Sequence, residues 1–206
     1  QPLFRAPRLH VMMGRSLHKE TKMQKYIDFD RTRSHNCLFN FVNGIRGCGK
    51  TYGKLKDDID RYMKGKGRFI YLRRSEEELK TLTTQKSGRL FNHVQTEYEG
   101  HALWCEANLL HIDKEVCGYA AALSTARKLK SDALDYVTDI IFDEYVIDDT
   151  TSQQRYLPDE VTAFFEFYET VARPGSRDYD VTVWFLGNAI SSSNPYFDFL
   201  NLDLPY

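Results

Sequence analysis

The chain has 206 residues, of which 42% are hydrophobic and 14% aromatic, and its formal net charge is −1. This length and apolar content are enough for one compact domain with a full core. No apolar run is long enough to cross a bilayer, and the start of the chain lacks the apolar core of a secretory signal, so we expect a soluble intracellular protein with no membrane partner. The scattered cysteines argue against a zinc site or a disulfide framework and are expected to be reduced thiols. They are Cys37, Cys48, Cys105 and Cys117.

The small net charge conceals an uneven distribution along the chain. Residues 1–36 hold eight basic against three acidic side chains, residues 37–130 hold seventeen against eleven, and residues 131–206 hold three against fifteen. A basic face could meet nucleic acid, or copies of the chain could associate head to tail, although such runs are also common on ordinary solvated surface.

Residues 1–35 show weak periodicity and many charges, so we expect a peripheral arm with one helix over His18–Tyr26. The first residue is not Met, which leaves open a trimmed start or attached foreign residues. The domain proper is expected to occupy residues 36–206.

A short glycine-rich stretch is the strongest signal in the chain. Cys37–Val42 reads as a buried strand, and four residues separate Gly44 from Gly49, which Lys50 and Thr51 follow at the start of a helical pattern. A strand, G-x-x-x-x-G-K-[ST] and a helix together predict a phosphate-binding loop, the alternative being a glycine-rich turn with an exposed lysine.

The chemistry of phosphate binding explains the spacing. Glycines can adopt positive φ and leave no Cβ in the way, so successive amides can turn inward around a polyphosphate. Lys50 would reach the terminal phosphates, and Thr51 would ligate Mg²⁺ at the helix N-terminus. The residues expected to surround the polyphosphate are Gly44, Ile45, Arg46, Gly47, Cys48, Gly49, Lys50 and Thr51.

Beyond the loop, the pattern predicts alternating strands and helices. The first helix should end at Gly65 and Gly67, Arg68–Arg73 should be a second core strand, and Glu76–Leu82 should be a helix capped by Ser75. This succession indicates an α/β fold with a mostly parallel central sheet flanked by helices.

Two further features of the middle of the chain are less specific. Arg73 and Arg74 follow a strand end, where ligands bind in α/β sheets, yet ordinary salt bridging is the favoured interpretation over contact with phosphate, DNA or a neighbouring subunit. The runs Leu109–Ile112 and Val116–Ala121 predict a β-hairpin insertion. Ser124–Leu129 reads as a connecting segment, with a loop at residues 130–132.

An acidic pair ends the next predicted strand. Thr138–Phe142 is apolar and is followed by Asp143 and Glu144. In a nucleotide-hydrolysing site the first carboxylate holds Mg²⁺ and the second deprotonates the attacking water. Adjacent acids are common on surfaces, but the apolar run before this pair favours burial, which would be costly without a metal or water to serve.

The last predicted elements bring two more polar candidates. A helix over Pro158–Val171 precedes Arg173, and a strand over Val181–Leu186 precedes Asn188. Asn188 could sense the terminal phosphate or the attacking water, and a turn-stabilising role is equally compatible with its position.

The chain closely resembles the phi29-like family of phage DNA-packaging ATPases. Six ordered stretches carry the resemblance: NFVNGIRGCGKTY, RFIYLRRSEEEL, VTDIIFDEYV, YLPDEV, ETVAR and NAISSSNPYF. It implies an ASCE P-loop ATPase that forms a homomeric ring at the capsid portal and drives double-stranded DNA into a preformed head. The expected ring is a pentamer. The site of action would be the cytoplasm of the infected cell, transiently on the procapsid, and a scaffolding RNA is left open as a partner.

The resemblance also implies roles for single residues. Lys50 and Thr51 would bind phosphate and Mg²⁺, Asp143 would be the Walker B acid, and Glu144 the catalytic base. Arg173 falls where the family has an arginine finger that reaches into the next subunit, and Asn188 would couple hydrolysis to movement.

Two departures from the family pattern are visible. The nuclease-like second domain is expected to be absent from this chain, and residues before 30 have no clear counterpart. Two hypotheses compete with this interpretation. The chain could be another nucleic-acid translocase or helicase, or it could be a nucleotide-binding assembly scaffold without turnover. A helicase would need stacking aromatics for single strands, and a scaffold has no need of Glu144.

Overall fold

The computed structural model describes the backbone of residues 9–13 and then residues 27–84, 89–128, 134–147, 155–173, 178–188 and 194–202. Within this part, eight strands form one sheet in the order β1-β2-β8-β7-β3-β6-β5-β4. The strands are β1 (Leu9–Met13), β2 (Phe39–Gly44), β3 (Arg68–Arg73), β4 (Leu103–Glu106), β5 (Leu109–Ile112), β6 (Glu115–Ala122), β7 (Val137–Asp143) and β8 (Thr182–Asn188). The sheet is parallel from β1 to β6 and antiparallel from β6 to β4.

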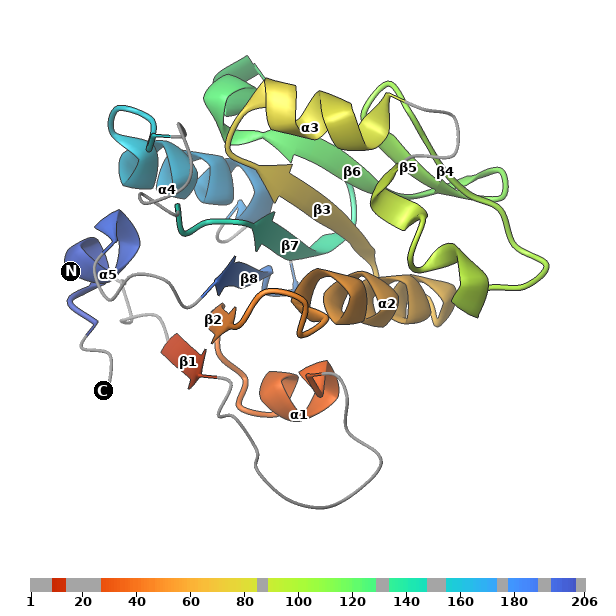
Figure 1. The fold of residues 1–206 in the computed structure, drawn as a ribbon, viewed down its shortest axis with the longest axis horizontal. Helices are drawn as coiled ribbons and strands as arrows, with labels where there is room; N and C mark the ends of the chain where they lie inside the picture. The colour runs from red at the N-terminus through yellow and green to blue at the C-terminus, as the bar shows by residue number, and fades with distance from the viewer. Residues whose placement is uncertain are drawn as a thin grey trace.

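Helices cover both faces of this sheet (Figure 1). The α-helices are α1 (Phe29–Arg33), α2 (Lys50–Met63), α3 (Glu76–Thr83), α4 (Glu160–Ala172) and α5 (Pro195–Leu200). Short 3₁₀ helices are η1 (Arg89–Phe91), η2 (Gln95–Glu97) and η3 (Leu123–Lys128). The mostly parallel α/β architecture predicted from the sequence is confirmed.

Two apolar layers explain why the central strands read as nearly continuous hydrophobic runs. On one face Leu55 and Ile59 of α2 pack on the sheet, and on the other Phe164 of α4 and Phe197 of α5 do so. All six residues of β2 are buried, because a parallel strand with helices on both sides has no solvated face.

The predicted elements fall close to their observed bounds. β3 has the expected range, and α3 begins after Ser75, whose hydroxyl accepts a hydrogen bond from the Glu78 amide at 3.2 Å. Several boundaries differ by one or two residues: β2 spans Phe39–Gly44 rather than Cys37–Val42, and β8 spans Thr182–Asn188 rather than Val181–Leu186. α4 begins at Glu160 rather than Pro158, because Asp159 adopts a left-handed conformation with φ 52°. The expected helix over residues 18–26 and the expected loop at 130–132 lie outside the described residues.

The predicted hairpin is present, but it is not an insertion apart from the sheet. β5 and β6 pair antiparallel, and β6 also pairs parallel with β3 from Phe69↔Gly118 onward. Gly118 permits this contact, since a Cβ there would lie 2.5 Å from the Phe69 carbonyl oxygen. The hairpin and β4 therefore extend the main sheet. η3 then connects β6 toward β7, as expected for this segment.

The described parts of residues 1–35 pack against the rest of the fold. β1 pairs in parallel with β2 at the edge of the sheet, and Phe29 of α1 is buried edge-to-face on Trp184 with ring centroids 5.4 Å apart. The charges of this region suggested solvated surface, whereas Arg33 neutralises carboxylates of α2 and β7.

Those carboxylates belong to a buried ion cluster. Lys54 is fully buried and contacts Asp57 at 2.8 Å, Asp58, and Asp139 at 3.4 Å, while Arg33 lies 2.8 Å from both Asp57 and Asp139. Burial alone would raise the pKa of Asp139, but Lys54 and Arg33 hold it below its usual range. Burial raises the pKa of Asp58 to about 8 against the pull of Lys54. The cluster ties α1 and α2 to β7.

Within the described residues no helix is both long and apolar enough to cross a membrane. The four cysteines are free thiols, as expected.

Replacing Asp139 with Asn should destabilise the fold by about 3 kcal/mol, because the buried Lys54 ammonium then loses one of its negatively charged partners. The low folded-state pKa of Asp139 means that its stabilisation is complete above about pH 5 and is lost as the pH falls below about 4. Denaturant unfolding between pH 7 and pH 3 checks both points.

At pH 7 the Asp139→Asn variant should have a lower free energy of unfolding than the unaltered chain. On acidification the variant should lose less stability than the unaltered chain. Glu76→Gln, which removes an exposed pair with Lys80, is the control and should change little. Equal stability of the Asp139→Asn variant and the unaltered chain, or parallel pH curves, would contradict this account of the cluster.

Candidate functional site

The glycine-rich loop lies at the carboxyl edge of the sheet, between β2 and α2. Gly47 and Gly49 have φ of 80° and 78°, values that glycine adopts without the strain a side chain would bring. Gly44 does not have positive φ; instead a Cβ there would meet the Cys48 sulfur at 3.1 Å. The loop turns directly into α2, whose first residues are Lys50 and Thr51.

The side chain of Lys50 folds back over this loop and is 8% exposed. Its Nζ donates to the carbonyl oxygens of Gly44 and Ile45 at 3.0 Å each, and to Asn188 Oδ1 at 3.2 Å. Asn188 is the last residue of β8 and pairs in register with Gly44. The ammonium and the amide side chain therefore meet at the loop, as a phosphate-sensing role for Asn188 would require.

The structure places Asp143 beside Thr51, at the end of β7. The Thr51 hydroxyl lies 3.0 Å from each carboxylate oxygen of Asp143, and the Tyr71 hydroxyl donates to Oδ2 at 2.7 Å. Burial raises the pKa of Asp143, opposed by Arg73, whose Nη1 is 3.6 Å away. The predicted proximity of loop and acidic pair is thus found.

These groups fit a magnesium ion. Mg²⁺ prefers oxygen ligands and is commonly held by one or two side chains, with phosphates and water completing the shell. The Thr51 hydroxyl and the Asp143 carboxylate are such a pair, and the described residues contain no cluster of three or more acidic, His or Cys side chains that could hold a metal without further ligands.

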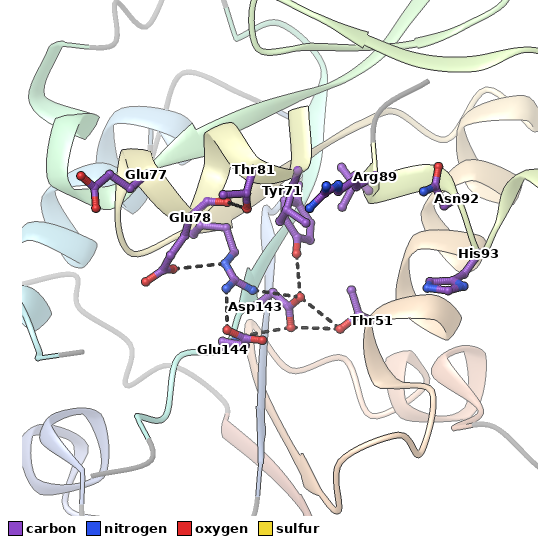
Figure 2. A pocket seen from close by; sticks show the side chains of 13 residues that line it. Thr51, Tyr71, Glu77, Glu78, Thr81, Arg89, Asn92, His93, Asp143 and Glu144 are labelled. Atoms are coloured by element: carbon purple, nitrogen blue, oxygen red, sulfur yellow. Dashed lines mark hydrogen bonds and ion pairs between the residues drawn. The ribbon is translucent and has the colours of Figure 1, made fainter. Parts of the chain in front are cut away.

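Glu144 follows at the turn after β7. Its backbone has φ 54°, its amide donates to Asp143 Oδ1 at 3.1 Å, and its side chain is 54% exposed. One carboxylate oxygen accepts from Arg73 Nη2, and Arg73 Nε also bonds Glu78 at 3.2 Å. Figure 2 shows Asp143 beside Thr51, with Glu144 next to Asp143.

Arg74 holds the turn after β7 through hydrogen bonds to its backbone. Its guanidinium donates to the carbonyl oxygens of Glu144 and Tyr145 at 3.2 and 2.7 Å and to Glu160 at 2.8 Å. The preference for salt bridging over ligand contact, drawn for Arg73 and Arg74 from the sequence, agrees with these contacts. Gly187 gives room for the turn, since a Cβ there would come within 2.6 Å of the Tyr145 ring.

Two adjoining hollows, each of about 660 Å³, open around these residues and share Thr51, His93, Asp143 and Glu144. The first extends along Tyr71, Arg73 and α3, and the second along the glycine-rich loop to Asn188. Sequence reasoning did not assign the residues that η1, η2 and their connecting turn contribute to the walls. These are Arg89, Leu90, Asn92, His93, Thr96 and Glu97.

The structure does not bring Arg173 to this site. α4 begins near the turn after β7, where Glu160 meets Arg74, and its far end lies beside the start of β8, because Tyr168 donates to the Val181 carbonyl at 3.3 Å. Arg173, the residue after α4, therefore lies toward the amino edge of the sheet, away from the loop.

Comparison with known proteins gives a consistent relationship. Residues 22–205 match the family model described as podovirus DNA encapsidation protein (Gp16). The DNA packaging proteins of Bacillus phages phi29 and PZA are each 37% identical over 179 residues, which is 87% of this chain and 49% of the relative. The chain thus spans about half the length of these relatives.

A solved structure agrees with the sequence matches. The N-terminal domain of the DNA packaging ATPase from bacteriophage phi29 superposes with a TM-score of 0.75 at 34% identity, covering 88% of this chain and 89% of that one. On the match over nearly its whole length, the chain belongs to the podovirus DNA encapsidation protein (Gp16) family.

Proposed function

We propose that the chain is the ATP-hydrolysing part of a viral DNA-packaging motor, which converts ATP and water to ADP and phosphate and uses the reaction to move double-stranded DNA into a preformed capsid. The observation that carries the proposal is the meeting of Lys50, Thr51 and the Asp143–Glu144 pair at one edge of the sheet. The names of the relatives, DNA packaging protein and DNA packaging ATPase, support the coupling to DNA.

In this proposal the loop is the P-loop of an ASCE ATPase and each group has a distinct role. The amides of the loop and Lys50 bind the phosphates of ATP, and Thr51 and Asp143 would hold Mg²⁺, which when bound neutralises charge on the reacting phosphate. Glu144 takes the proton of the attacking water, and Arg73 fixes the direction of its carboxylate. Asn188 reports on the terminal phosphate from the neighbouring strand.

We further infer that the motor is a homomeric ring at the capsid portal, with five copies as the expected number, acting in the infected cell. In a head-to-tail ring the amino edge of one sheet can face the carboxyl edge of the next. The position of Arg173 suits this arrangement, because its guanidinium could then reach a neighbour's terminal phosphate and stabilise charge in the transition state.

Lys50→Ala should weaken ATP binding by at least about tenfold and abolish hydrolysis, because it removes the cation that faces the phosphates. Titration calorimetry with Mg²⁺-ATP and a phosphate-release assay measure the two effects. Lys80→Ala, on the exposed face of α3, is the matched control. Unchanged turnover in the Lys50 variant would remove the loop from the mechanism.

Glu144→Gln should keep ATP binding and reduce turnover about 10²- to 10⁴-fold, because an amide cannot accept the water's proton. Single-turnover hydrolysis measures the chemical step without the influence of product release. The exposed Glu106 provides a control as Glu106→Gln. Normal turnover would reassign the base, and loss of binding would make Glu144 part of the binding site only.

Mixing Arg173→Ala subunits with Glu144→Gln subunits should restore part of the activity that each variant lacks alone, because one intact site can form where an intact Arg173 meets an intact Glu144. The ATPase rate of mixed samples against mixing ratio tests this. The control is the Arg155→Ala variant, which replaces Arg173→Ala in an otherwise identical mixing experiment. No recovery at any ratio would argue against a site shared between subunits.

A further inference from the structure

The outer wall of the second hollow comes from a segment that the proposed mechanism does not use. Between η1 and η2 the chain exposes Asn92 and His93, and it exposes Thr96 and Glu97 within η2. Thr96 and Glu97 line the hollow that contains the glycine-rich loop, and His93 lines both hollows. In Figure 2 His93 approaches Thr51 from this segment.

The segment packs against α2, the helix that starts at the loop. Phe91 and Val94 are buried in the core on either side of His93. Tyr98, just after Glu97, donates to Asp60 at 2.7 Å and to the Lys56 carbonyl at 3.1 Å, both on α2. These anchors place the segment that carries His93, Thr96 and Glu97 along the hollow that Lys50 and Thr51 also line.

The two walls of the second hollow differ in chemistry. One wall is the loop with Lys50 and Asn188, which suits phosphate. The other carries the His93 ring, the Thr96 hydroxyl and the Glu97 carboxylate, and the Tyr52 ring of α2 lines the same hollow. An ionised carboxylate only accepts hydrogen bonds and would repel phosphate, so this wall suits rings and hydroxyl or amino donors.

We propose that this second wall binds the nucleoside half of the nucleotide, with Glu97 accepting hydrogen bonds from the ribose hydroxyls and His93 packing on the base together with Tyr52. The hollow, at about 660 Å³, lies within the range of sites for ligands of this size. The inference rests on the proposed function, because the phosphates must lie on the loop for the nucleoside to reach this wall.

The two walls can be tested separately with two ligands, ATP and inorganic tripolyphosphate, each with Mg²⁺. Glu97→Gln and His93→Ala should each weaken ATP binding about five- to tenfold and leave tripolyphosphate binding unchanged, because only ATP carries a nucleoside. Both side chains are exposed, so the variants should melt like the unaltered chain. Glu99→Gln, an exposed acid of the same region that lines neither hollow, is the control.

Calorimetric titrations of the whole chain distinguish failure of the nucleoside site from failure of the proposed function. Unchanged ATP affinity in both variants, or an equal loss for both ligands, would overturn the nucleoside site while the loop stands. If the unaltered chain bound neither ligand, or if Lys50→Ala bound tripolyphosphate normally, the proposed function itself would fail. A loss confined to ATP supports the assignment, and 2′,3′-dideoxy-ATP should then bind the Glu97→Gln variant as well as ATP does.

Discussion

The contact between the Thr51 hydroxyl and the Asp143 carboxylate, 3.0 Å to each oxygen, is the interaction on which the site depends. It joins the first turn of α2 to the end of β7, two strands away from β2 in the sheet. A carboxylate this deeply buried is costly unless donors or a cation satisfy it, and here Thr51, Tyr71 and Arg73 do so. The same arrangement leaves an oxygen-lined position where a metal bound to phosphate would be favourable.

The rest of the architecture keeps the two partners of this contact in place. α2 is held in place by the buried cluster around Lys54 and by the hydrogen bond from Tyr98 to Asp60. The turn after β7 is fixed by Arg74, which spans the carbonyls of Glu144 and Tyr145. Buried ion pairs contribute little net stability compared with apolar packing, but breaking one is costly, so such clusters hold geometry strictly. These contacts hold the loop and the acidic pair next to each other.

Much of this could be predicted from the sequence because the signals are local. Apolar runs, Ser75 as a helix cap and the glycine spacing gave the order of strands and helices, and parallel strands necessarily place Gly44, Asp143 and Asn188 at one edge. The integration of α1 was not predictable, since the partner of Arg33, Asp139, is 106 residues away. His93 and Glu97 carry no motif, and only the fold brings their segment across from the loop.

The most direct measurement is a structure of the chain with Mg²⁺ and a non-hydrolysable ATP analogue. The account predicts the terminal phosphate beside Lys50 and Asn188, the metal within about 2.1 Å of the Thr51 hydroxyl oxygen, and Glu144 facing the terminal phosphate. A nucleotide bound away from the glycine-rich loop, or a metal remote from both Thr51 and Asp143, would contradict it.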